Sequence, residues 1–219
     1  DIACGNGQMS RRLAELGAQV VAIDGSPKMI ECAQQRSQGK NITYQVADVT
    51  KSEDLQFCES FQFDAVLCNM ALMDIENIDP VFELAHKVLK DSGRFVFSIT
   101  HPCFDKSVGP HITETHENKG TLKYTHSIKV EHYLTPEAMT VRAIPSLPST
   151  HFFYHRSLGE YLNAAFSAGF SMSGIAEPAF PQQSNQIEHK GWHNLSDIPV
   201  VLIVKLEKMA HKLQSAKQD

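Results

Sequence analysis

The start of the chain constrains its fold more than any other stretch. Residues 1–7 form a glycine-spaced turn, DIACGNG, and a helical pattern follows it. An apolar run over 20–23 comes next and ends in Asp24. This order predicts a strand end, a tight loop, a helix, and a second strand with a carboxylate at its carboxyl end. Gly5 and Gly7 lack a Cβ, so a ligand can lie against bare backbone there, and Asp24 offers two acceptor oxygens that suit a ribose diol.

The spacing of the glycines separates the cofactor classes that use such a turn. A nicotinamide or flavin fingerprint has the form G-x-G-x-x-G, but Ser10 occupies the third glycine position. The turn also has no Gly-Lys-Ser/Thr to hold phosphates. A nicotinamide-dependent oxidoreductase is therefore the less favoured alternative.

The turn resembles the D/E-x-G-x-G-x-G motif of class I S-adenosylmethionine-dependent methyltransferases. Asp1, Gly5 and Gly7 fit the motif, and Ala3 replaces its first glycine. We expect Ala3 to make the turn with a negative φ. The resemblance implies that Asp24 holds the ribose hydroxyls of the cofactor. The alternative is an ordinary turn between a strand and a helix, without a ligand.

Two later stretches extend the resemblance. Residues 47–49 follow a strand expected over 42–46, where the family lines the adenine, although Asp48 equally suits a helix N-cap or a loop carboxylate. Residues 61–69 resemble the F-D-x-V/I strand that ends beside the transferred methyl, so that residues 69–72 would form the far wall of the cofactor site. The Asn/Asp-Pro-Pro-aromatic motif of nucleobase amino-methyltransferases is missing there. The cofactor-binding residues that the resemblance implies are Asp1, Ala3, Cys4, Gly5, Gly7, Asp24, Gly25, Met29, Ala47, Asp48, Val49, Asn69, Met70 and Ala71.

Strands alternate with helices up to residue 101, which predicts parallel βαβ units. Helices are expected from Ser26-Pro27 to about residue 38 and from Asp79-Pro80 to residue 90, and a strand over 94–100. The pattern resumes with a capping box at Ser157 and strands over 170–177 and 199–205. We therefore predict an α/β fold, a mostly parallel seven-stranded Rossmann-like sheet with helices on both faces. Its core would be residues 1–101 and 156–206, followed by a polar tail, 207–219.

The glycine loop should follow an apolar strand in the middle of the sheet, but only Ile2 represents one. Two neighbouring strands would otherwise have unpaired backbone groups. We therefore expect the natural protein to extend upstream, with a strand and a helix.

The stretch 102–155 has no helical periodicity, and 127–133 alternates like an exposed strand. We interpret it as a partly antiparallel insertion. Ligands bind at the carboxyl edge of such sheets, so the insertion is the expected substrate lid.

His101 is the candidate catalytic residue. Methyl transfer is an in-line displacement that the protein mainly aligns, and a base is needed only when the acceptor must lose a proton. His101 stands where a strand meets the insertion, so it is a general base or substrate ligand, or else a hydrogen-bonded loop histidine. Aromatic residues of the insertion suit an apolar or aromatic acceptor, although the insertion's own small core would look the same. The expected substrate-binding residues are Leu72, His101, Phe104, Phe153 and Tyr154.

Other chemistries are less well supported. Seven of the eleven histidines fall between 101 and 155, with His151 and His155 able to share a strand face, and His189 and His193 a helix face. No H-E-x-x-H or paired Cys/His spacing exists, so we expect no metal. Cys103 is expected to be a structural thiol rather than a nucleophile.

Composition bounds the remaining possibilities. The 219 residues, 42% hydrophobic and 21% charged, are typical of a globular domain. Five cysteines without paired spacing favour a cytoplasmic protein, no apolar run approaches ~18 residues, and no basic stripe accompanies the net charge of −5. We expect a partner that is neither nucleic acid nor membrane, and the oligomeric state is undetermined.

The sequence thus favours an S-adenosylmethionine-dependent methyltransferase that methylates an oxygen, nitrogen or carbon of a small molecule and releases S-adenosylhomocysteine. The alternative outside catalysis is a regulatory or scaffold domain that binds the cofactor without turnover.

Overall fold

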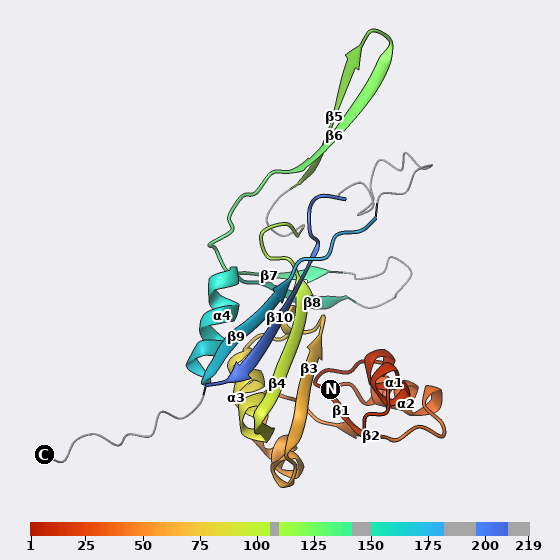
Figure 1. The fold of residues 1–219 in the computed structure, drawn as a ribbon, viewed down its shortest axis with the longest axis vertical. Coiled ribbons are helices and arrows are strands. Elements are labelled where there is room, and N and C mark those ends of the chain that lie inside the picture. The colour runs from red at the N-terminus through yellow and green to blue at the C-terminus, as the bar shows by residue number, and fades with distance from the viewer. Residues whose placement is uncertain (106–109, 142–149, 182–195, 210–219) are drawn as a thin grey trace, which may run out of the picture.

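The computed structural model describes residues 1–105, 110–141, 150–181 and 196–209 (Figure 1). Its first half contains α1 (Gln8–Glu15), β1 (Val20–Asp24), α2 (Pro27–Arg36), β2 (Ile42–Val46), the 3₁₀ helix η1 (Ser52–Ser60), β3 (Phe63–Asn69), the 3₁₀ helix η2 (Leu72–Asp74), α3 (Asp79–Val88) and β4 (Leu89–Thr100). Its second half contains β5 (His111–Asn118), β6 (Thr121–Ile128), β7 (Glu137–Val141), β8 (His151–His155), α4 (Leu158–Ser167), β9 (Phe170–Ala176) and β10 (Val201–Lys208). Within these residues, no helix is both long and apolar enough to cross a bilayer.

The central sheet is mixed. β1 and β2 pair in parallel, as do β3 and β4, whereas β10 runs antiparallel between β4 and β9. Ile2 joins the two halves, because it forms parallel bridges to Ile23 of β1 and to Cys68 of β3. The predicted α/β class is confirmed. The predicted mostly parallel sheet is confirmed only in part, since the β4-β10-β9 half is antiparallel.

An apolar groove lies between β1 and β3 on the amino side of Ile2. It has a volume of about 930 Å³ and is lined by Met9 and Leu13 of α1, Val21 of β1 and Val66 of β3, among others. The lining includes Asp1 but neither Gly5 nor Asp24, so of the first loop's predicted cofactor residues only Asp1 borders the groove.

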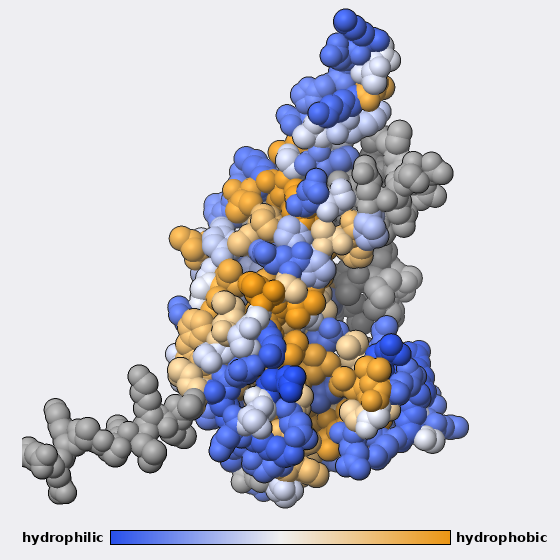
Figure 2. Space-filling view, in the orientation of Figure 1, coloured by the Kyte–Doolittle hydropathy of each residue, from blue (hydrophilic) through white to orange (hydrophobic). Residues whose placement is uncertain are grey.

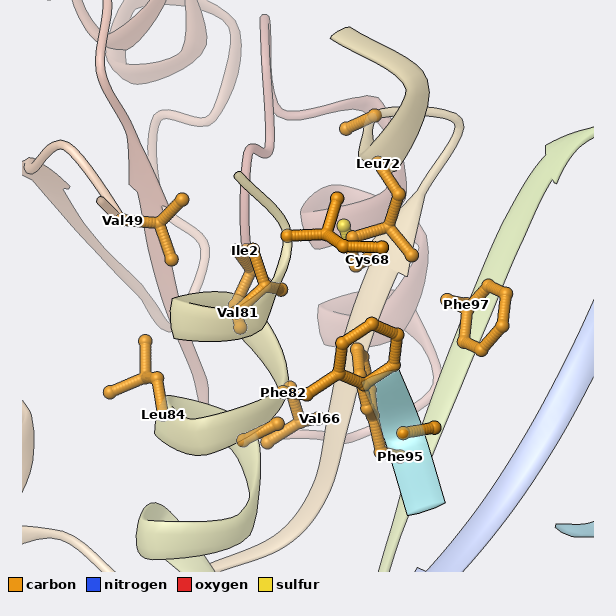
Figure 3. Packing of buried hydrophobic residues seen from close by; sticks show 14 of the residues in the cluster. Ile2, Val49, Val66, Cys68, Leu72, Val81, Phe82, Leu84, Phe95 and Phe97 are labelled. Carbon is orange, nitrogen blue, oxygen red and sulfur yellow. The ribbon is translucent and has the colours of Figure 1, made fainter. Parts of the chain in front are cut away.

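α3 anchors the strands that end at the predicted site. Its buried face consists of Val81, Phe82, Leu84, Ala85 and Val88, the stripe expected from the 3.6-residue period. The ring of Phe82 meets those of Phe95 and Phe97 on β4 edge-on, at centroid distances of 5.7 and 5.8 Å (Figure 3). Each such ring contributes about 1.5–3 kcal/mol by leaving water, so β4 is held firmly on α3.

The predicted helix starts are confirmed. The Ser26 side chain accepts a hydrogen bond from the Met29 N–H at the start of α2. At the start of α4, Ser157 and Glu160 form both bonds of a capping box.

The predicted boundary between α3 and β4 is wrong. The sequence pattern extends α3 to residue 90, but the helix ends at Val88 and β4 already begins at Leu89. A Cβ on Gly93 would lie 2.8 Å from the Leu89 side chain and 3.1 Å from the Phe63 carbonyl oxygen, so the glycine permits close packing here. The early part of β4 therefore pairs with β3 around a register shift between Phe63 and Ala65.

The insertion contains two antiparallel hairpins, as predicted in outline. β5 pairs with β6, and β7 pairs with β8. The β5–β6 hairpin projects away from the sheet, its β5 residues are all exposed, and its surface is mainly hydrophilic (Figures 1 and 2). Pairing ends at Ile128, short of the predicted residue 133. Only the β7–β8 hairpin lies by the sheet's carboxyl edge, where β8 contacts η2. The polar tail falls mostly outside the described residues, and the domain limits stay predictions.

Candidate functional site

The glycine-spaced turn follows Ile2 at the carboxyl edge of the sheet. Ala3, Gly5 and Gly7 all have positive φ, of 53°, 53° and 75°. The expectation that Ala3 keeps a negative φ is therefore wrong. A left-handed alanine costs about 1–2 kcal/mol, which the surrounding bonds must offset. One of them runs from the Cys4 N–H to the Ile23 carbonyl, at 2.9 Å.

The two motif glycines have different surroundings. A Cβ on Gly5 would meet no atom within 4 Å, so its backbone faces open space. A Cβ on Gly7 would lie 2.3 Å from the Tyr44 hydroxyl and 3.0 Å from the Ala33 side chain. Gly7 is thus needed for packing against α2 and β2, and the bare backbone that a ligand can approach is at Gly5.

Asp24 closes the turn. Its Oδ2 accepts a hydrogen bond of 2.8 Å from the Gly5 N–H, and its Oδ1 accepts one of 2.9 Å from the Ser26 N–H. A carboxylate has about four acceptor positions, so two remain for a ligand hydroxyl pair. Asp24 therefore shapes the loop as well as offering acceptors beside it.

Ser10 and Asp1 interact within the same loop. The buried Ser10 hydroxyl donates to the Asp1 Oδ2 at 2.5 Å. The residue that breaks the dinucleotide fingerprint thus orients the first residue of the motif. Asp1 consequently has a structural contact that the resemblance did not reveal.

The turn after β2 lies beside Asp24. A Cβ on Gly25 would be 3.9 Å from the Asp48 Cα and 4.0 Å from the Ala47 carbonyl oxygen, so these predicted residues adjoin. The Asp48 carboxylate accepts from the Thr50 hydroxyl and N–H, and this bonding keeps its pKa below the usual value. Asp48 thus has the loop-carboxylate role that the sequence leaves open as an alternative. Two other predicted cofactor-binding residues differ in exposure. The Met29 side chain is exposed, whereas the Val49 side chain is buried in the core.

The turn after β3 forms the opposite side. Met70 has a φ of 53°, and its N–H donates to the carbonyl oxygen and the hydroxyl of Ser98. The Ser98 hydroxyl donates to Asn69 Oδ1 at 2.8 Å. Sequence reasoning missed Ser98, although a serine inside the apolar run of β4 was a signal. Ala71, the last predicted residue of this wall, is nearly buried at 7% exposure.

The prediction that Leu72 contacts the substrate is wrong. Its side chain is fully buried in the core cluster, beside Cys68 (Figure 3). A side chain with no exposed surface cannot line the acceptor site in this conformation.

His101 is buried, and both of its ring nitrogens are engaged. Nδ1 accepts from the Cys103 N–H at 3.2 Å, and Nε2 lies 2.9 Å from Glu177 Oε1. The backbone donor requires an unprotonated Nδ1, so Nε2 carries the proton and donates to Glu177. The Phe104 ring packs on the imidazole at a centroid distance of 4.6 Å. This geometry favours the hydrogen-bonded loop histidine over the general base.

Of the other predicted aromatic residues, Tyr154 lies beside Arg156. Its guanidinium lies 5.4 Å from the Tyr154 ring centroid and donates to the carbonyl oxygens of Leu72, Ile75 and Glu76. Phe153 packs partly buried against the core. Arg156 thus fixes the loop after η2, and sequence reasoning missed it because its acceptors are backbone atoms far away in the chain.

Comparison with known proteins identifies the amino-terminal part. Residues 1–97 match the sequence profile of a family described as "Methyltransferase domain". Residues 1–97 are therefore similar to that family. The matched stretch contains the whole glycine turn, Asp24, and the walls after β2 and β3.

Relatives extend beyond this domain. Over 181 residues, the chain is 26% identical to the "uncharacterized methyltransferase YbaJ" of Bacillus subtilis, covering 80% of this chain and 66% of the relative. It is 34% identical over 100 residues to a ubiquinone biosynthesis O-methyltransferase of Xanthomonas axonopodis, covering 45% and 41%. A crystal structure of an S-adenosylmethionine-dependent methyltransferase from Mesorhizobium loti superposes with a TM-score of 0.65 at 26% identity, covering 95% of this chain and 89% of that one. The chain thus spans 66% and 41% of the length of these two curated relatives.

A carboxylate that sequence reasoning missed follows the wall after β3. Asp74 Oδ1 lies 3.5 Å from His151 Nε2 of β8. Burial raises the pKa of Asp74 to about 6, and the nearby His151 partly opposes this shift. The signal was an aspartate two residues after the Asn69–Leu72 wall, but its partner is visible only in three dimensions.

The thiols near the glycine turn are poorly ionised. Burial, and then the charge of Asp24, raises the pKa of Cys4 to about 12. Burial likewise raises the pKa of Cys68 to about 12. Among the described residues, no three His, Cys, Asp or Glu side chains gather as a metal site, and His189 and His193 lie outside those residues.

Proposed function

We propose that this chain is an S-adenosylmethionine-dependent methyltransferase that acts on a small-molecule acceptor. The open backbone of Gly5, hydrogen-bonded to Asp24, is the observation that carries the proposal. The match of residues 1–97 to the methyltransferase-domain family and the likeness to the Mesorhizobium loti structure support it.

The residues present fit the cofactor. The Gly5 backbone and the two remaining acceptor positions of Asp24 suit the ribose. Gly25 and Ala47 would line the adenine side, and the backbone of residues 69–71 the opposite wall. When bound, S-adenosylmethionine supplies a methyl carbon activated by its sulfonium sulfur. The protein aligns the acceptor and excludes water, which the β7–β8 hairpin beside η2 would assist.

We also propose that the sheet has the seven-stranded order of a Rossmann-like methyltransferase. The order β2-β1-Ile2-β3-β4-β10-β9 has seven positions when Ile2 is counted as the place of a strand between β1 and β3. Ile2 bridges both neighbours in parallel, which supports that count.

Transfer of labelled methyl tests the proposal against a binding domain without catalysis. The chain is incubated with methyl-labelled S-adenosylmethionine and a filtered metabolite extract, and both S-adenosylhomocysteine and labelled small molecules are measured. We expect both to form together. Cofactor binding without either product would establish the regulatory or scaffold alternative instead.

A further inference from the structure

Asp74 and His151 bring an acid–base pair to the carboxyl edge of the sheet. The Asp74 N–H donates to the Ala71 carbonyl oxygen at 2.8 Å, so the carboxylate is one turn beyond the proposed cofactor wall. His151 is the first residue of β8, from the hairpin beside η2. The two side chains are 39% and 37% exposed, which leaves them accessible to a ligand but partly shielded from water.

The charged and titratable groups around Asp74 come from several elements. Arg156 directs its guanidinium to the carbonyls of Leu72, Ile75 and Glu76. Tyr161 of α4 and Cys68 of β3 interact with Asp74, but burial raises the pKa of each to about 12, so both are neutral at pH 7. Among these groups, His151 forms the ion pair with the Asp74 carboxylate, with its Nε2 3.5 Å from Oδ1.

We propose that Asp74, oriented by His151, is the general base of the reaction and that the acceptor is a phenol-class hydroxyl. This inference rests on the proposed function. A phenol has a pKa near 10, so it is mostly neutral at pH 7 and must lose its proton to become a strong nucleophile. An acceptor with a free lone pair, such as a thioether, needs no base.

The proton transfer balances. The acceptor O–H bond breaks, its electron pair stays on oxygen, and the proton passes to an Asp74 carboxylate oxygen. The acceptor oxygen then takes the methyl from the sulfonium, whose C–S bonding pair stays on sulfur. A carboxylate with a pKa near the working pH suits this role, since it is largely ionised and yet basic enough to accept the proton. His101 offers no equivalent acceptor, because its Nδ1 already accepts the Cys103 N–H.

Carboxyl carbon NMR tests the pair without depending on turnover. We expect the Asp74 side chain in the wild-type protein to titrate with a midpoint at about 6. Protonated His151 lowers this midpoint, so His151→Gln should move it to higher pH. A midpoint near 4, the ordinary aspartate value, would overturn the proposal.

Methyl transfer to 3,4-dihydroxybenzoate tests the acceptor class and the role of Asp74. Asp74→Asn should lower turnover by ~10²–10⁴-fold and remove the acid limb of the pH profile, with cofactor affinity little changed. The matched control is Asp79→Asn, which changes an exposed aspartate of α3. This variant should keep both the wild-type turnover and the acid limb of the pH profile. His151→Gln should move the acid limb upward, and this second variant keeps the test decisive if Asp74→Asn misfolds.

Two failures are distinguishable. A wild-type protein that binds S-adenosylmethionine by calorimetry but never methylates the catechol, or an Asp74→Asn variant that keeps the acid limb, overturns only this inference. A wild-type protein that binds no S-adenosylmethionine overturns the proposed function, and this inference with it.

Discussion

The backbone N–H of Gly5 donates a 2.8 Å hydrogen bond to the side chain of Asp24, nineteen residues later in the chain. Since Asp24 also accepts from the Ser26 N–H, one carboxylate joins the glycine turn to the start of α2. The same residue is the proposed ribose acceptor, so loop structure and cofactor binding depend on one side chain.

Asp24→Ala should therefore weaken both properties. Loss of two backbone hydrogen bonds to a charged group should lower the free energy of unfolding by on the order of 2–3 kcal/mol, measured by urea denaturation. Calorimetry should show a parallel loss of S-adenosylmethionine affinity. Asp64→Ala is the control, because its exposed carboxylate pairs with Lys90, away from the glycine turn. If Asp24→Ala matched that control in both measurements, the linking role of Asp24 would be excluded.

Ala3→Gly should stabilise the protein. Its φ of 53° is strained for alanine and free for glycine, so we expect a gain of up to about 1 kcal/mol, after subtraction of the extra entropy of glycine in the unfolded chain. The same change at Ala85, inside α3, should instead cost at least about 0.5–1 kcal/mol. Chemical denaturation measures both. A destabilised Ala3→Gly variant would show that Ala3 has a negative φ in solution.

His101→Gln should affect stability more than chemistry. It removes the Nδ1 acceptor of the Cys103 N–H and displaces the bond to Glu177, which should cost about 1–3 kcal/mol. His116→Gln, on the exposed face of β5, should cost nothing measurable in thermal unfolding. The pH limb of methyl transfer should persist in both variants. Loss of that limb in His101→Gln alone would restore His101 as the general base.

Arg156→Lys should loosen the loop that follows η2. A lysine ammonium cannot donate to three spread carbonyls or lie flat over Tyr154, so we expect a loss of about 1–3 kcal/mol in urea unfolding and faster amide exchange over residues 72–76. The control Arg12→Lys, on the exposed side of α1, keeps a positive charge near Glu15. It should change neither the free energy of unfolding nor the amide exchange over residues 72–76. Unchanged exchange in Arg156→Lys would mean that the loop is held by other contacts.

Local patterns predicted the framework well. The Ser157 capping box and the buried stripe of α3 depend on residues close together in sequence, so spacing alone located them. The engagement of His101 could not be predicted in this way, because Glu177 lies 76 residues away. The pairing of Asp74 could not be predicted either. Its partner His151 is on a hairpin, and the local sequence pattern does not indicate that this hairpin lies beside η2. Gly7 shows a third limit, since the motif indicated open backbone where Tyr44 packs.

Titration calorimetry of S-adenosylmethionine against Gly5→Ala and Gly17→Ala tests the central claim most directly. Both glycines have positive φ, 53° at Gly5 and 94° at Gly17, and a Cβ added to either would meet no atom within 4 Å, so neither substitution creates a clash, but only Gly5 lies in the turn held by Asp24. We predict that the wild type and Gly17→Ala bind the cofactor with similar affinity, that Gly5→Ala loses at least tenfold, about 1.4 kcal/mol, and that nicotinamide dinucleotide binds to none of them. Equal cofactor affinity in all three proteins, or binding of nicotinamide dinucleotide by the wild type, would contradict the assignment of this turn to S-adenosylmethionine.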